Sequence, residues 1–308
     1  MKKILLFLVF LPFTLFAQDD LLGELEDEIA DEKQAVSSIF KGIKIVNFES
    51  TKLVGENQLQ FIISHRFGSL RDGVDNFFGL DNASARIQFV YGVTDWLHIS
   101  ASRSGFGQTY DLAAKYHIVK QKKNGFPFTI AGYNIININT ELDQDLLPEL
   151  DFNDRLGYAN QLLISRKFND WLSLQLIPTH FHDNTVVENR QSNSQYAIGF
   201  GGRLKLTKRF ALIADWGVHL NRSGSTRTLE IPDPNGGIGT IITTENVPTV
   251  FNNPLAVGVE IETGGHVFQL HFSNAQAIFA NGFLGQARGS FSSGDIFFGF
   301  NLSRAFSL

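Results

Sequence analysis

Alternation of apolar and polar side chains is the dominant pattern along this chain. From about residue 42 onward, apolar residues recur at every second position, which is the period of a β-strand whose two faces differ. A short preliminary segment covers residues 42–50. After it, the sequence predicts twelve longer strands at 57–67, 83–91, 96–104, 109–119, 126–137, 157–167, 171–181, 195–205, 209–220, 255–262, 266–274 and 294–304.

The C-terminal segment, residues 294–308, shows the alternation most clearly. One of its faces is small or polar, and the other is mostly aromatic and carries Ile296, Phe298, Phe300, Leu302 and Phe306. A terminal strand this apolar would be an adhesive edge on a soluble protein. In a closed transmembrane barrel the same strand is paired on both sides and its apolar face meets lipid. We therefore expect these five side chains to face the membrane.

The connections between the predicted strands alternate between two classes. Short turns lie at 92–95, 120–125, 169–170, 206–208 and 263–265. Long loops lie at 68–82, 138–156, 182–194, 221–254 and 275–293, and a short link at 105–108 is the exception. Outer-membrane barrels have short periplasmic turns and long extracellular loops. The alternation makes the strand number even and places both chain ends in the periplasm. The predicted fold is therefore all-β, a single antiparallel transmembrane barrel of about 12 strands.

Two details refine this barrel. In the loop at 221–254, the β-prone runs 226–231 and 238–244 flank a turn-rich stretch, which predicts a hairpin that stands above the membrane and continues the strands on either side. Trp96 and Trp171 each follow a polar turn, as interfacial aromatic residues do. Strict alternation would instead place both tryptophans on the inner face, where they would cap the lumen.

The N-terminus predicts export. Lys2 and Lys3 precede an apolar stretch at 4–16 that is too short to anchor a protein in a membrane, so residues 1–17 are interpreted as a cleaved signal peptide. Residues 18–41 form an acidic leader with an apolar helical stripe. It is either a periplasmic helix that docks on a partner or on the barrel mouth, or a solvated leader. Residues 42–308 form the barrel, in the outer membrane of a Gram-negative bacterium.

Composition agrees with a barrel and narrows the list of partners. The mean hydropathy is −0.03 because only alternate residues of a barrel face lipid. The formal net charge of −5 argues against a nucleic-acid partner, which would require a clustered basic surface. The chain has no cysteine, so disulfides and thiolate metal sites do not contribute. No cofactor is indicated.

Ionisable residues fall on the predicted inner face of the strands. Such groups persist at membrane depth when they face one another or water. A lumen enclosed by twelve strands is intermediate between the filled barrels of eight strands and the open porins. The mixed charges are consistent with a narrow solute path or with a salt-bridged plug, and the sequence leaves both open. The predicted lumen residues are Arg66, Arg86, Asp111, Lys115, Arg203, Asp215, Glu260 and Asp295.

Two local patterns suggest chemistry. His271 and Ser273 lie two residues apart in a His-x-Ser-Asn stretch that looks like that of the outer-membrane lipid hydrolases, phospholipase A and lipid A deacylase. There, serine would attack an ester with histidine as the base. Alternation places the pair on the wet face, and no partner motif is present. His180 and His182 with Asp183 could contact a metal ion, but the sequence shows no third ligand nearby, so no metal site is predicted.

Several stretches resemble a family of outer-membrane β-barrels from Bacteroidota that is catalogued as a domain of unknown function. They are spread over nearly the whole mature chain, at 40–46 (FKGIKIV), 63–68 (ISHRFG), 78–81 (FGLD), 91–95 (YGVTD) and 299–306 (GFNLSRAF). The resemblance implies a barrel and no particular activity.

The sequence thus predicts a passive barrel, either a narrow channel for small solutes or a structural barrel. The alternatives are a lipid hydrolase that uses Ser273 and His271, and a secreted β-sandwich binding module. The expected partners are outer-membrane lipid, the barrel-assembly machinery through the C-terminal strand, and a periplasmic partner of the acidic leader. Nucleic acid is not expected.

Overall fold

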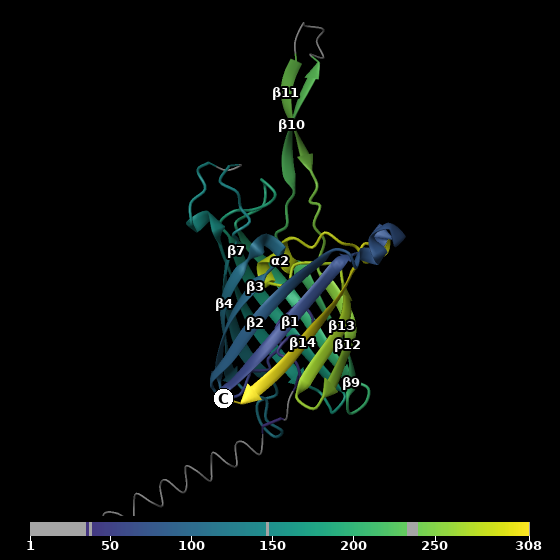
Figure 1. Ribbon diagram of the computed structural model, residues 1–308. Helices are drawn as coiled ribbons and strands as arrows, with labels where there is room; N and C mark the ends of the chain where they lie inside the picture. The colour runs from purple at the N-terminus through teal and green to yellow at the C-terminus, as the bar shows by residue number, and fades with distance from the viewer. Residues whose placement is uncertain (1–34, 37–38, 146–147, 233–239, 308) are drawn as a thin grey trace, which may run out of the picture.

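Twelve antiparallel strands close on themselves in the computed structural model of the chain (Figure 1). The structure describes residues 35–307 except 37–38, 146–147 and 233–239. The barrel strands are β1 (Gln58–Ser69), β2 (Ala83–Thr94), β3 (Leu97–Ser104), β4 (Tyr110–Val119), β5 (Thr129–Ile138), β6 (Leu156–Lys167), β7 (Leu172–Asp183), β8 (Ser194–Lys205), β9 (Phe210–His219), β12 (Leu255–Thr263), β13 (His266–Ser273) and β14 (Phe297–Ser307).

The ring closes where β1 pairs with β14. Their register runs from Gln58 opposite Ser307 to Arg66 opposite Gly299, and an irregularity follows before Ser69 pairs with Phe297. Every barrel strand therefore has a hydrogen-bonded neighbour on both sides. A bilayer requires this arrangement because it offers no water to unpaired backbone groups. The predicted closed barrel is confirmed, and all twelve predicted strands overlap the observed ones.

The connections divide the barrel into two ends. The turns after β2, β4, β6, β8 and β12 gather at one end, here called the short-turn end, and the longer loops gather at the other, the long-loop end. β1 begins and β14 finishes at the short-turn end, which is the lower end in Figure 1. The predicted export signal, residues 1–17, and the leader up to residue 34 lie outside the described residues.

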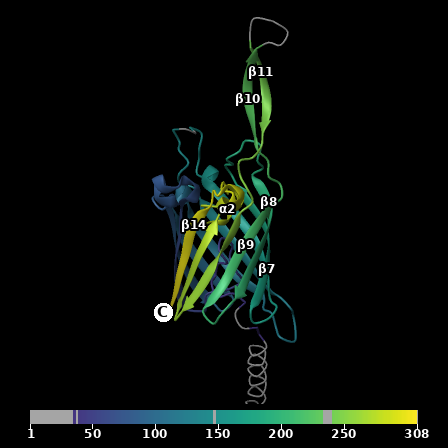
Figure 2. The ribbon, with the colours of Figure 1, turned by 90° about the vertical axis from the view of Figure 1, so that its right-hand side faces the viewer.

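The predicted hairpin is present at the long-loop end. β10 (Ser225–Pro232) and β11 (Thr240–Val247) form a two-stranded sheet that projects well beyond the barrel (Figures 1 and 2). The hairpin does not continue the wall strands without a break, because it is a sheet of its own and residues 220–224 and 248–254 separate it from β9 and β12. Pro248 and Pro254, which lack the N–H that a ladder needs, lie in the segment between β11 and β12.

Side chains alternate across the wall as the sequence predicts. Phe89, Leu174 and Leu270 are 51%, 44% and 40% exposed on the outer surface, whereas their strand neighbours point into the lumen. Apolar residues face outward because a barrel wall separates hydrocarbon from a polar interior. In β14 the same outward face carries Phe298, Phe300, Leu302 and Phe306, with Ile296 just before the strand.

The two tryptophans that follow short turns lie at the rim of the barrel. Trp96 and Trp171 are each 54% exposed at the short-turn end. Each belongs to the turn and precedes the first residue of its strand, β3 or β7. Their exposure at this rim agrees with an interfacial aromatic girdle.

Helical segments are short and lie in the loops of the long-loop end. Among the described residues, no helix has the length and apolar character to cross a bilayer. The helix α2, which the loop between β13 and β14 contains, turns into the mouth of the barrel (Figure 2). The segments are η1 (Leu70–Asp72), η2 (Val74–Gly79), η3 (Phe106–Gln108), η4 (Asn153–Arg155), α2 (Ala280–Gly285) and η5 (Phe291–Ser293).

A closed ladder predicts resistance to detergent at room temperature. We expect the refolded protein to migrate differently on an SDS gel before and after boiling, because the ring must be broken as one unit. A sample denatured in urea without refolding is the control and is expected to migrate like the boiled protein. Identical mobility of the unboiled refolded protein and the boiled protein would contradict closure.

Candidate functional site: a plugged lumen

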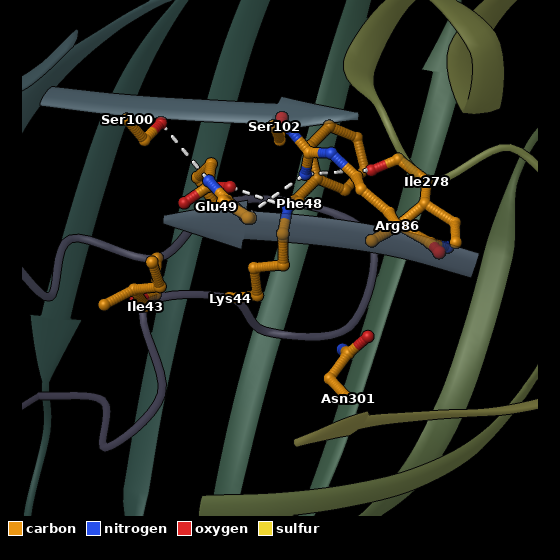
Figure 3. Close-up of polar contacts among 12 residues, drawn as sticks. Ile43, Lys44, Phe48, Glu49, Arg86, Ser100, Ser102, Ile278 and Asn301 are labelled. Carbon is orange, nitrogen blue, oxygen red and sulfur yellow. Dashed lines mark hydrogen bonds and ion pairs between the residues drawn. The ribbon is translucent and has the colours of Figure 1, made fainter. Parts of the chain in front are cut away.

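The lumen is occupied by the chain's own residues 39–54, here called the plug segment. This segment enters beside the short turn between β4 and β5, where the Val36 N–H donates to the Gln121 carbonyl, turns back inside the barrel (Figure 3) and leads into β1. Its apolar side chains are buried: Phe40, Ile43, Ile45 and Phe48 are each 3% exposed or less. The predicted preliminary segment at 42–50 is therefore part of an internal plug, and not part of the wall. Its backbone forms a bend with a single bridge between Lys44 and Glu49.

A carboxylate of the wall holds the tip of the plug segment. Asp215, on β9, points inward and is 2% exposed. Its Oδ2 atom accepts hydrogen bonds from the backbone N–H groups of Val46, Asn47 and Phe48, at 3.0, 2.7 and 3.1 Å. Three successive N–H groups that converge on one oxygen form a concave anion site. The plug tip thus compensates the charge of a buried carboxylate.

A buried cluster of charges holds the body of the plug segment. Glu49 lies 2.8 Å from the Nζ atom of Lys115 on β4, and 2.6 Å from the Nζ atom of Lys44 in the plug segment itself. Burial alone would raise the pKa of the Glu49 carboxyl, but the charges of Lys115 and Lys44 outweigh burial and lower it. Lys115 also donates to the backbone carbonyls of Ile43, Ser50 and Lys52.

Amide and guanidinium groups of the wall bind the remaining polar groups of the plug segment. Gln175 accepts from the Thr51 N–H at 3.0 Å and donates to the Glu49 carbonyl at 2.7 Å. Around the tip, Arg66 donates to the Asn47 side chain at 3.1 Å, and Asn301 donates to the Val46 carbonyl at 3.1 Å. These bonds satisfy backbone groups that lie outside any sheet, which a buried segment requires.

Glycines on the inner face of β8 make room for the plug segment. A Cβ atom on Gly201 would lie 2.2 Å from Cδ1 of Ile45, and one on Gly199 would lie 2.7 Å from the Phe48 ring. Both separations are shorter than any van der Waals contact, so a side chain at either position would force Ile45 or Phe48 to shift. The wall and the plug segment are therefore shaped to each other.

A second closure enters from the long-loop end. The loop between β13 and β14, residues 274–296, is here called the α2 loop, and α2 itself is wholly buried. Phe283 meets Phe48 of the plug segment edge to face, with ring centroids 4.8 Å apart. Arg86 of the wall donates to the Ile278 carbonyl of the α2 loop at 3.4 Å (Figure 3). The two closures thus meet inside the barrel.

Seven of the eight predicted lumen residues line the closed interior. Three of them contact the plug segment directly, and the others form ion pairs within the wall. Arg86 pairs with Asp111 at 3.0 Å, and Arg203 pairs with Glu260 at 2.7 Å. Of the two arrangements that the sequence left open, this structure has the salt-bridged plug. The seven residues are Arg66, Arg86, Asp111, Lys115, Arg203, Asp215 and Glu260.

Asp295 is the exception among the predicted lumen residues. β14 begins at Phe297, so Asp295 precedes the strand and does not share its inward face. It is half-buried at the long-loop end, where it pairs with Ser290 through the backbone and accepts from the Ser69 hydroxyl at 2.5 Å. Its role is to fix the rim, because the chain must turn there to enter β14.

The pair considered for ester hydrolysis lies deep in the lumen. Ser273 and His271 are 0% and 1% exposed. The Ser273 hydroxyl accepts from the Asn47 side chain at 3.3 Å and from the Ala275 N–H at 3.1 Å. Among the described residues, neither ring nitrogen of His271 has a hydrogen-bond partner. In the ranges that the structure describes, the two side chains share no hydrogen bond, which a serine nucleophile and its histidine base would need, and both lie beneath the plug segment.

Of the three residues considered for a metal ion, the strand geometry separates Asp183 from the two histidines. His180 and His182 point outward from β7, and Asp183 points inward, where it accepts from Asn281 at 2.7 Å. His182 hydrogen-bonds Ser194 and Asn184. Within the described part of the chain, no group of three His, Cys, Asp or Glu side chains is placed to bind a metal ion.

The main residues that sequence analysis missed belong to the plug segment. Asn47 and Glu49 contact the wall through their side chains, whereas Lys44 pairs with Glu49 and contacts the wall through its carbonyl, and none of the three is on a wall strand. A signal was available: residues 42–50 alternate like a strand, yet the twelve longer segments already complete an even, closed ring. A strand-like segment in excess of a closed ring has to pack elsewhere.

The geometry defines a membrane β-barrel with a polar lumen that is closed by its own chain. The chain belongs to the family "Membrane bound beta barrel domain (DUF5777)", which it matches over residues 40–306. The match begins inside the plug segment, so the plug is part of the family domain. No curated protein sequence matches this chain significantly.

Solved structures similar to this chain include three outer-membrane proteins. An outer-membrane channel from Pseudomonas putida F1 shares 10% identity with a TM-score of 0.48, over 83% of this chain and 97% of that one. The NanC porin shares 8% identity with a TM-score of 0.46, over 81% and 100%. The KdgM porin shares 9% identity with a TM-score of 0.44, over 81% and 99%.

Removing the Asp215 carboxylate should loosen the plug segment. Because the chain has no cysteine, Val46→Cys provides a unique thiol at the buried plug tip. We expect this thiol to react with a polar maleimide about tenfold faster when Asp215→Ala is added, since three N–H groups lose their acceptor. Asp295→Ala, at the rim, is the matched control. Equal labelling rates in the Asp215 and Asp295 backgrounds would contradict this role.

The two adjacent glycines of β8 allow a second test. Gly201 faces the plug segment and Gly202 faces outward. We expect Gly201→Val to speed labelling of Val46→Cys, because its side chain would overlap Ile45, and Gly202→Val to leave the rate unchanged. Both variants should remain heat-modifiable, because the ladder does not need either glycine. The proposed packing fails if the two variants label alike.

Proposed function

We propose that this protein is a passive outer-membrane channel for small solutes that its own plug segment closes at rest. The observation that carries the proposal is the lining of the lumen. The inner wall presents charged and amide groups to the plug segment, and water could hydrate the same groups if the plug left. A barrel that served only as a support could fill its interior with its own apolar side chains.

The plug segment can leave without breaking the wall. None of the twelve strands of the closed ladder includes a plug residue. The segment is covalently continuous with the wall only where it leads into β1, and before it the chain is held by a bridge from Ala35 to Lys122 and a bond from the Val36 N–H to the Gln121 carbonyl. Its contacts with the wall are hydrogen bonds, ion pairs and apolar packing, each of which water or a small displacement can replace at about 0.5–3 kcal/mol. Release is therefore a local rearrangement.

The second candidate function is a structural barrel. It is favoured by the closure of the lumen from both ends, by the plug segment and by the α2 loop. The α2 loop also fills the long-loop half of the lumen, with Phe283 and Leu284 at 2% and 0% exposure. A conducting state requires both closures to move. In a structural barrel both would stay, and the protein would serve by presenting its loops and the β10–β11 hairpin outside the cell. Neither function requires catalysis, so we propose that the protein is not an enzyme.

The proposed location and partners rest on the barrel fold, the family resemblance and the position of the acidic leader. We place the barrel in the outer membrane of a Gram-negative bacterium, of the Bacteroidota as the family resemblance implies, with the short-turn end in the periplasm. The C-terminal strand would be the segment that the barrel-assembly machinery engages. The acidic leader, residues 18–41, precedes and overlaps the plug segment, so a periplasmic partner that binds the leader would be placed to pull the plug. The bilayer lipid is the remaining partner.

A reversible lock tests the channel. The hydroxyls of Thr51, in the plug segment, and Ser165, on β6, are 2.6 Å apart, so Thr51→Cys with Ser165→Cys should form a disulfide. In planar bilayers we expect small, discrete openings from the wild-type protein, none from the oxidised double variant, and recovery after reduction. Each single cysteine variant is the control and should conduct like the wild type in both redox states.

The outcomes separate the two candidates. If the wild-type protein never opens across voltages of both signs, the channel is wrong and the structural barrel stands. Conductance that persists in the oxidised variant, with the disulfide verified by mass spectrometry, would show that solute does not pass where the plug segment lies. That result would overturn the assignment of the plug as the gate.

A further inference from the structure

The outer wall carries a row of polar side chains where lipid contact would favour apolar ones. Asn134, Asn160, His180 and Tyr196 lie on the successive strands β5, β6, β7 and β8, each directly opposite the next in the ladder. They are here called the polar stripe. Their strand neighbours point into the lumen, so the stripe belongs to the outer surface.

The two asparagines of the stripe lie at the depth of the hydrocarbon. Asn134 is near the middle of β5 and Asn160 is well inside β6. Both are exposed, and Nδ2 of Asn134 donates to Oδ1 of Asn160 at 2.6 Å. This pair uses one donor and one acceptor and leaves the other amide atoms without a mutual bond. Acyl chains offer such atoms no hydrogen bond, which makes their exposure to lipid unfavourable.

The wall is also irregular beside the stripe. Pro178 lies within β7, where a proline is unusual because it cannot donate to the ladder. The pairing of β6 with β7 skips Leu162 and Leu163, which lie opposite this region, and resumes on both sides in the same register. The ladder between β6 and β7 is therefore interrupted next to the polar residues Asn160 and His180.

The outer surface is hollowed at the stripe. A groove of about 590 Å³ there is lined by all four stripe residues together with Leu162 and Pro178. The wall on the other side of the barrel differs, because it is covered by packed aromatic side chains such as Phe272 and Phe298, whose ring centroids are 5.6 Å apart. A smooth aromatic surface suits lipid, whereas a groove with amides suits a partner that carries donors and acceptors of its own.

We propose that this face of the barrel, β5 to β8, is the interface of a homodimer, in which the polar stripes of two copies contact each other. A carboxamide is both donor and acceptor, so Asn134 and Asn160 are complementary to their own copies about a twofold axis. A second copy supplies hydrogen-bonding groups at the right depth in the membrane. Lipid headgroups lie at the interface and not at mid-strand.

Cysteine crosslinking in the cell envelope tests the interface. Ile136→Cys and Leu162→Cys place single thiols on the outer surface beside the stripe, and Leu270→Cys places one on β13 at the opposite wall. With a short bismaleimide, we expect crosslinked dimers from the first two variants and at least about fivefold fewer from the third. Equal crosslinking of all three variants would indicate random collision in the membrane and would overturn the proposal.

A second experiment tests the amides themselves. The double variant Asn134→Leu with Asn160→Leu makes the outer surface more apolar, so it should insert and stay heat-modifiable. We expect it to dimerise about tenfold more weakly than the wild type in native mass spectrometry from micelles. Leu270→Ala, on the opposite wall, should leave the dimer intact. A wild-type monomer that retains a lipid, lost in the double variant, would assign the stripe to that lipid and refute the dimer.

Discussion

A buried carboxylate sets the central constraint of this molecule. Asp215 points into the lumen and is 2% exposed, and a buried carboxylate without donors is strongly unfavourable. The plug segment resolves this with three backbone N–H groups that converge on one oxygen. The carboxylate in turn satisfies N–H groups that no sheet or helix accommodates. The wall thus supplies the acceptor that the plug segment needs, and the plug segment supplies the donors that the wall needs. This mutual satisfaction of buried polar groups favours the closed state.

The contacts that close the lumen are of two kinds, polar and apolar, and they have different effects on the plug segment. The hydrogen bonds and ion pairs fix where the plug segment sits, because charged and amide partners are directional. Ile45 and Phe48, buried against glycines of β8, supply the non-directional part. Phe48 also touches Phe283, so it is the point at which the two closures share a contact. Because neither closure belongs to the ladder, the wall keeps its ring whatever the lumen contains.

The sequence predicts the wall well because every second residue of a barrel strand faces lipid, which imposes a period of two on the sequence. All twelve strands and their even number can be predicted from that period. The charged lumen positions also follow from that period, Asp295 excepted because it lies outside the strand. The partners of those charges are not predictable in the same way. Asp215 is bound by backbone N–H groups, which every residue except proline carries. The residue types in the sequence therefore give no sign of this contact. Likewise, the sequence does not distinguish Gly201 from Gly202, because only the contact with the plug segment gives Gly201 its role.

The α2 loop connects the inside of the barrel to its outer end. Arg222, which follows β9 and precedes β10, donates to the Leu284 carbonyl at 2.9 Å, and Asn252, which follows β11, donates to the Gly289 carbonyl at 3.0 Å. Both ends of the projecting hairpin are thereby bonded to the loop that carries Phe283. A displacement of the hairpin base would have to break these bonds or move the loop. Since Phe283 rests on Phe48, a moving loop would also uncover the apolar tip of the plug, so the two closures are coupled through the packing of Phe48 against the α2 loop.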